Sequence, residues 1–102
     1  MSATVVEGGV SIQWTTSMEV DTVGFRVFRE DLGGSREKVS MVDVSGLVLS
    51  RGNGLTGGEY EIKDLSRGAL GASVYWLQDQ DLQGRTQMHG PIIVERSRVA
   101  SR

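Results

Sequence analysis

Hydrophobic residues alternate with polar ones in short runs along this chain, and this pattern limits its fold more than any other feature. Residues 72–94 read ASVYWLQD, QDLQG and RTQMHGPIIV, so two extended runs flank a polar stretch that ends in Gly84. Successive side chains on a strand point to opposite faces, and the pattern therefore predicts a β-hairpin. Tyr75 and Trp76 are sequence neighbours and must face opposite ways. One of them enters the core, and the other lies on the outer face.

Five earlier runs show extended patterns and are separated by turn residues. Val10, Ile12 and Trp14 alternate with polar residues, which places Trp14 at the centre of the core. No segment of ten or more residues has a helical period. Together with the hairpin, the runs at 3–7, 10–15, 24–29, 38–44 and 59–64 predict about seven strands. This number and spacing predict an all-β fold, a two-sheet antiparallel β-sandwich.

Residues 45–58 break the pattern. A brief apolar run at Leu47, Val48 and Leu49 is followed by SRGNGLTGG, which holds four glycines. Because glycine restricts the backbone least, we expect a long mobile loop here.

Composition bounds the classes of function. With 102 residues the chain is long enough for one domain over 1–102, with a core over about 10–94. It has no cysteine, so disulfides and thiolate metal sites are excluded. Its 11 basic and 13 acidic residues are dispersed, and its apolar runs are at most four residues long. We therefore expect no nucleic-acid partner, no membrane insertion and no signal peptide. We also expect the isolated domain to be a monomer.

Several blocks with their spacing resemble fibronectin type III domains. Residues 10–14 (VSIQW) resemble the second strand of that family, 24–29 (GFRVFR) the third, and 73–84 the sixth strand with its following turn. WTTSMEVDTVGF, YEIKD, LQDQDLQG and HGP resemble a bacterial branch of the superfamily. One position departs from the family, because Ser73 stands where the family has a corner tyrosine. The hydroxyl tie between that strand and the preceding connection is therefore not expected from this position.

The resemblance covers residues 10–94 and implies an immunoglobulin-like, fibronectin type III topology. It further implies a non-catalytic spacer or protein-interaction module from a larger secreted or cell-surface bacterial protein. The partners would be neighbouring domains of the parent chain, or a protein or carbohydrate. Fold analogy alone identifies no ligand.

The candidate interaction face consists of Arg26, Phe28, Val74 and Trp76. Their strand phases are opposite to those of the expected core residues Phe25, Val27, Tyr75 and Leu77. In fibronectin type III domains the third and sixth strands are neighbours. An exposed apolar row of this kind can dock a partner. The alternative is a set of cross-strand pairs that stabilise the sheet, with Arg26 over the indole. An adhesive or carbohydrate-binding domain that uses the Phe28/Trp76 face or the 45–58 loop is the rival function.

The remaining motifs indicate no chemistry, and we expect no catalytic, cofactor-binding or metal-binding residues. Residues 79–84 (DQDLQG) match the first half of a calcium loop, but Gly90 stands where the bidentate Glu is required, which favours a polar hairpin tip. His89 is the only histidine and lies beside Gly90 and Pro91, a sequence that predicts local hydrogen bonding at a bulge. The adjacent carboxylates Glu30 and Asp31 do not by themselves indicate a catalytic pair.

Overall fold

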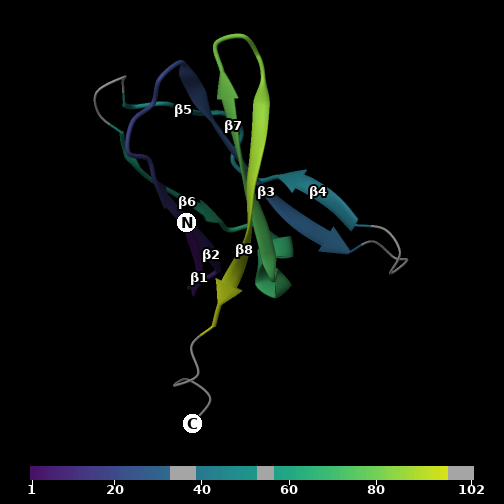
Figure 1. Cartoon of the computed structure of the whole chain (residues 1–102). Helices are drawn as coiled ribbons and strands as arrows, with labels where there is room; N and C mark the ends of the chain where they lie inside the picture. Colours follow the sequence, from purple (N-terminus) through teal and green to yellow (C-terminus); the bar gives the residue numbers. More distant parts are fainter. Residues whose placement is uncertain (33–38, 53–56, 97–102) are drawn as a thin grey trace.

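The computed structural model describes residues 1–32, 39–52 and 57–96 and shows strands throughout, with one short 3-10 helix (Figure 1). The elements are β1 (Ser2–Val6), β2 (Gly9–Thr15), β3 (Thr22–Leu32), β4 (Val39–Asp43), β5 (Val48–Leu49), β6 (Glu59–Asp64), η1 (Arg67–Gly71), β7 (Val74–Asp81) and β8 (Thr86–Glu95). The predicted all-β class is confirmed. Among the described residues no helix is long and apolar enough to cross a membrane.

All strands belong to one curled sheet. The hydrogen-bonded order is β4-β3-β7-β8-β1-β2-β6, and β5 pairs with β3 beside β4. Every pair is antiparallel except β1 with β8, where Ala3 lies opposite Val94 and Thr4 opposite Glu95 in parallel. The prediction of a wholly antiparallel arrangement is therefore wrong for this pair, and the sheet is mixed. Alternation along a strand gives its two faces but not the direction of its neighbour, so sequence periodicity could not reveal the exception.

The predicted strands are present, with ends shifted by a few residues. β3 is the largest change, because it has eleven residues and runs past the predicted end at residue 29. The prediction for 45–58 is wrong in part, since Val48 and Leu49 form β5 against Phe25 and Gly24. A two-residue strand is too short to show an alternating pattern. Residues 53–56 of that predicted loop, and residues 33–38, lie outside the described residues.

The core lies between the two halves of the curled sheet. Trp14 of β2 is 2 % exposed and stacks on Tyr60 of β6, with ring centroids 5.2 Å apart and planes within 6°. Phe25 of β3 packs against both rings, with its centroid 5.7 Å from that of Trp14 and 5.0 Å from that of Tyr60. β2 and β6 belong to one half of the sheet and β3 to the other. The curl thus gives a sandwich-like core, and the central position predicted for Trp14 is confirmed.

A buried ionic cluster ties the end of β6 to β3 and β7. Arg29 donates from Nη1 to Asp64 Oδ2 at 2.8 Å, and from Nε and Nη2 to the two Asp31 oxygens at 2.7 and 3.0 Å. The Tyr75 hydroxyl also donates to Asp64 Oδ2, at 2.8 Å. A tyrosine tie is therefore present although Ser73 cannot make it. Tyr75, two residues further along, makes it instead because its side chain points into the core.

Close packing above this cluster requires a glycine in η1. A Cβ atom at Gly68 would lie 2.5 Å from Arg29 Nη2 and 2.7 Å from its Cζ. The short helix therefore covers the guanidinium directly with its backbone. Arg29 follows the same alternation as Phe25 and Val27, but a charged residue at a core phase is normally assigned to the surface, so sequence reasoning missed it.

Candidate interaction face

The predicted interaction residues lie together on the outer face of the half formed by β3, β4, β7 and β8. Phe28 of β3 pairs directly with Trp76 of β7, and Arg26 pairs with Gln78. Val74 pairs with Ile93 of β8. Directly paired residues share a face, so Arg26, Phe28, Val74 and Trp76 are neighbours on one surface. All four side chains are half-buried rather than fully exposed.

Two hydrogen bonds join polar groups of this face. Trp76 Nε1 donates to Glu30 Oε2 at 2.6 Å, and Arg26 Nη1 donates to Asp43 Oδ2 at 2.9 Å. Arg26 is thus engaged by a carboxylate. Among the described residues the cation–π contact is that of Arg51 over Tyr60, and not the one of Arg26 over the indole that belonged to the alternative interpretation of this face. Glu30 and Asp31 point to opposite faces, since Asp31 binds the buried Arg29. Their side chains serve two different contacts.

The absence of a side chain at Gly90 leaves room for the Trp76 ring to lie against the β8 backbone. A Cβ atom at Gly90 would lie 2.9 Å from Trp76 Cε3, and Gly90 has φ 141°, which L side chains rarely adopt. The β7–β8 register places Tyr75 opposite Ile92 and Leu77 opposite His89, so two residues of β8 oppose Trp76 alone. This is the bulge predicted beside His89.

Four exposed apolar residues extend the face, and the sequence analysis did not include them. Val39 (53 % exposed) and Met41 (41 %) lie on β4, and Met88 (40 %) and Ile93 (60 %) lie on β8. Met41 pairs with Glu30, Met88 with Gln78 and Ile93 with Val74, so their faces follow from these pairings. We call the combined surface of Phe28, Trp76, Val74, Val39, Met41, Met88 and Ile93 the outer apolar strip. The signal was present in the alternation of VSMVD, but only the strand order shows that β4 and β8 flank β3 and β7.

His89 makes the local bond that its position predicted. Its Nε2 lies 2.7 Å from Asp79 Oδ2, across the β7–β8 pair. The hairpin tip is also polar and closed on itself, because Asp81 accepts from the Gln83 amide at 2.9 Å and from the Arg85 amide at 2.9 Å. Arg85 Nε adds an ion pair at 2.8 Å. The prediction of a hairpin tip is confirmed. Within the ranges 1–32, 39–52 and 57–96, no group of three or more His, Cys, Asp or Glu side chains is placed to hold a metal ion.

A buried carboxylate that sequence reasoning missed organises the loops beside the core. Glu19 is 4 % exposed and accepts hydrogen bonds from the Tyr60 hydroxyl at 2.7 Å and from the Gly52 amide at 2.8 Å. The hydroxyls of Thr16 and Ser50 donate to it as well. Burial alone would raise the pKa of Glu19, but these hydrogen bonds outweigh burial and lower the pKa from its ordinary value of 4.5 to about 2. Part of the stretch predicted as a mobile loop is thereby fixed to the loop before β3.

Glu19 is expected to make the stability of the protein depend on acid pH. Its folded-state pKa of about 2 lies below the ordinary value of 4.5, so its stabilisation is complete above about pH 4.5 and disappears as the pH falls through the folded pKa. Glu19→Gln should cost on the order of 2 kcal/mol at neutral pH, because the amide nitrogen faces donors. The difference in unfolding free energy between Glu19→Gln and the unsubstituted chain should shrink as the pH falls from 4.5 toward 2. Urea unfolding at a series of pH values measures this, with exposed Glu7→Gln as the control, and a difference independent of pH would contradict it.

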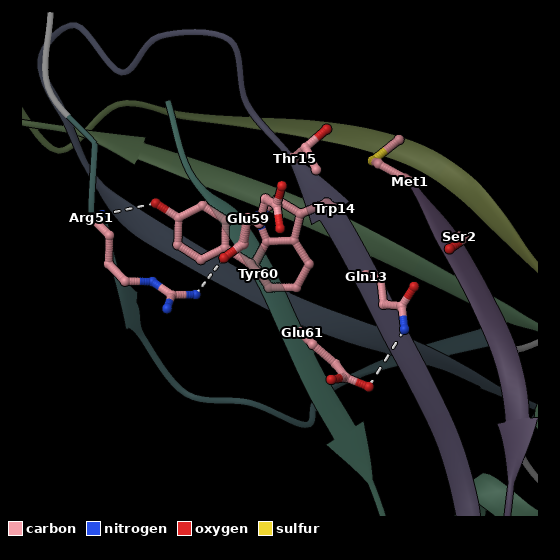
Figure 2. A pocket seen from close by; sticks show the side chains of 9 residues that line it. All are labelled: Met1, Ser2, Gln13, Trp14, Thr15, Arg51, Glu59, Tyr60 and Glu61. Atoms are coloured by element: carbon pink, nitrogen blue, oxygen red, sulfur yellow. Dashed lines mark hydrogen bonds between the residues drawn. The ribbon is translucent and has the colours of Figure 1, made fainter. Parts of the chain in front are cut away.

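An open pocket of about 640 Å³ lies at the start of β1 and the adjoining parts of β2 and β6 (Figure 2). Most of its lining side chains are polar. Gln13 Nε2 lies 3.5 Å from Glu61 Oε2, and Arg51 Nη2 donates to the Glu59 carbonyl at 2.6 Å. The Arg51 guanidinium also lies over the Tyr60 ring, 4.6 Å from its centroid. Figure 2 shows Arg51 reaching from its loop toward the edge of β6.

Comparison of the chain with known proteins found no relative. No family model matches the chain, and no curated protein or solved structure matches it.

Proposed function

We propose that this chain is a non-catalytic spacer or protein-interaction module of fibronectin type III type, from a larger secreted or cell-surface bacterial protein. The outer apolar strip is its contact surface. The observation that carries the proposal is the pairing of Phe28 with Trp76 on a face where Trp76 already donates to Glu30 and Arg26 to Asp43. Covering such a surface costs little free energy, because these polar groups keep their hydrogen bonds when water is removed and the apolar side chains leave water.

The strand arrangement supports the family part of the proposal. β1, β2 and β6 form one half of the curled sheet, and β3, β4, β7 and β8 form the other, with the aromatic core between them. This grouping of strands by chain order agrees with the immunoglobulin-like topology that the sequence resemblance implies.

The direction of the chain supports a spacer role. β1 and β8 lie side by side and run in parallel, so the chain enters β1 and leaves β8 in the same direction. Domains joined before β1 and after β8 would then follow one another along a line. This geometry suits a module whose task is to separate or present its neighbours.

The accessibility of Trp76 tests the contact surface. In the isolated domain we expect acrylamide to quench the Trp76 indole and to leave Trp14 protected, because Trp14 is buried and Trp76 is only half-buried. Within the longer parent chain we expect Trp76 to become protected, while Trp76→Ala should cost only about 1 kcal/mol of stability. Single-tryptophan variants (Trp14→Phe and Trp76→Phe) assign each signal. Equal quenching of Trp76 in the isolated domain and in the parent chain would contradict the proposed surface.

A carbohydrate-binding role is the second candidate, and the open pocket favours it. Gln13, Glu61 and Arg51 offer planar polar groups of the kind that bind sugar hydroxyls, and Arg51 comes from the 45–58 stretch. Titration with a panel of neutral disaccharides, followed by amide chemical shifts, distinguishes the two roles. Saturable shifts at Gln13 that Gln13→Ala removes would favour this candidate, and shifts confined to the Phe28/Trp76 face would place the sugar there.

A further inference from the structure

Among the described residues the sheet ends in two edge strands, β6 and β4, and they are protected very differently. β6, at one end, has charged residues at Glu59, Glu61 and Lys63. The Thr16 amide donates to the Gly58 carbonyl, so by the alternation of an antiparallel ladder these three residues carry the outward backbone groups. Arg51 also occupies the Glu59 carbonyl at this edge. Charge on an edge strand and occupied edge groups both discourage pairing with another chain.

β4, at the other end, lacks this protection within the part of the chain that the structure describes. Its sequence is VSMVD, and its single charged residue, Asp43, stands at its end. Asp43 Oδ2 binds Arg26 at 2.9 Å, and Asp43 Oδ1 accepts from the amides of Ser45 at 3.1 Å and Gly46 at 2.8 Å. Burial would raise the pKa of Asp43, but these contacts hold it below its ordinary value. The carboxylate is thus satisfied within its own chain and presents little repulsive charge to a strand alongside.

The backbone groups on the free side of β4 can be identified. The Val44 amide donates to the Val27 carbonyl at 2.9 Å, so Val44 faces β3. In an antiparallel ladder the residues that face the partner alternate, which turns Val42 and Ser40 toward β3 as well. Val39, Met41 and Asp43 therefore carry their N–H and C=O groups on the open side. An extended strand with matching spacing can pair with these groups.

We propose that β4 pairs with β4 of a second copy of this chain, antiparallel and centred on Met41. This pairing is self-complementary, since Val39 then lies opposite Asp43 of the second copy and Met41 opposite Met41. It forms about six backbone hydrogen bonds, two for each of three facing pairs. The side chains of Met41 and Val39 lie on the outer apolar strip, and Met41 meets its counterpart at the two-fold axis. The protected edge at β6 stops further addition, so the assembly closes as a dimer.

This inference does not rest on the proposed function, and it departs from the monomer expected for the isolated domain. Five paired residues make a small interface, for which we expect a dissociation constant of about 10 µM to 1 mM. Sedimentation velocity of the whole chain from about 10 µM to several millimolar therefore spans the equilibrium. A single monomer boundary throughout that range would overturn the proposal.

Charge substitution at Met41 tests the geometry. Met41→Lys and Met41→Glu each place like charges opposite one another across the two-fold axis, and each should weaken dimerisation at least tenfold. A one-to-one mixture of the two variants should restore it, because Lys then faces Glu. Lys63→Glu on β6 is the matched control and should leave dimerisation unchanged. Thermal melts show whether each variant is folded. A mixture that stays as monomeric as the separate variants, or a loss of dimer in Lys63→Glu alone, would overturn the pairing.

Discussion

Replacing Trp14 by alanine is expected to destabilise the protein by about 3–5 kcal/mol. The indole is 2 % exposed, stacks on Tyr60 and meets the edge of Phe25, so its removal leaves a cavity between the two halves of the sheet. Its Nε1 has no hydrogen-bond partner among the described residues, and the indole therefore contributes through packing. Chemical denaturation measures the loss.

Trp14→Phe distinguishes the loss of the whole aromatic ring from the loss of the larger indole alone. It keeps an aromatic ring in the stack and should cost less than Trp14→Ala by about 2 kcal/mol. Trp76→Ala is the comparison on the outer face, with an expected cost of about 1 kcal/mol. A loss below about 1 kcal/mol for Trp14→Ala would show that the aromatic stack is not central to stability.

Arg29→Met is expected to cost about 3–5 kcal/mol, although methionine is close to arginine in length. The change leaves the Asp64 carboxylate buried without its cation, and removes both bonds to Asp31. Burial acts to raise the pKa of Asp64, while hydrogen bonds from Ser66 and Tyr75 and the contact with Arg29 lower it. A buried charge that loses its partner is costly because water cannot replace the contact.

Two further variants make this prediction specific. Arg85→Met breaks an ion pair in which the arginine side chain is 76 % exposed, and it should change stability by less than about 0.5 kcal/mol. The double variant Arg29→Met with Asp64→Leu should be less destabilised than the sum of the two single changes, by at least about 1 kcal/mol. Urea denaturation of the three Arg29 and Asp64 variants completes the cycle. Additive losses would show that Arg29 and Asp64 do not act as a pair.

The candidate face shows which part of a site can be predicted from the alternation of polar and apolar residues along a strand. The phase of GFRVFR placed Phe28 outside, and the phase of SVYWL placed Trp76 outside, and the structure pairs these two residues. Their adjacency was expected only through the resemblance to a family with neighbouring third and sixth strands. Met41 and Ile93 join the same surface through the strand order, which no local pattern encodes.

The buried polar residues were beyond local reasoning for a different reason. Glu19 and Arg29 look like surface residues, because a charge is normally left in water. Glu19 is stabilised by donors from residues 50, 52 and 60, and Arg29 by carboxylates at residues 31 and 64. Asp31 is close to Arg29 in sequence, but the other partners lie more than 30 residues from the residues they bind. Their convergence therefore exists only in the folded chain.

By itself the sequence determined the all-β class, the approximate strands, the inward faces of Trp14, Phe25 and Tyr75, and the polar hairpin tip. These features depend on the period of two along a strand and on local turn residues, which can be read directly from the order of amino acids. The tertiary structure alone decided the parallel β1–β8 pair, the short strand β5, the buried sites of Glu19 and Arg29, and the unprotected edge at β4. Each of these depends on contacts between segments distant in the chain, and such contacts form only when the sheet curls and its strands take their order.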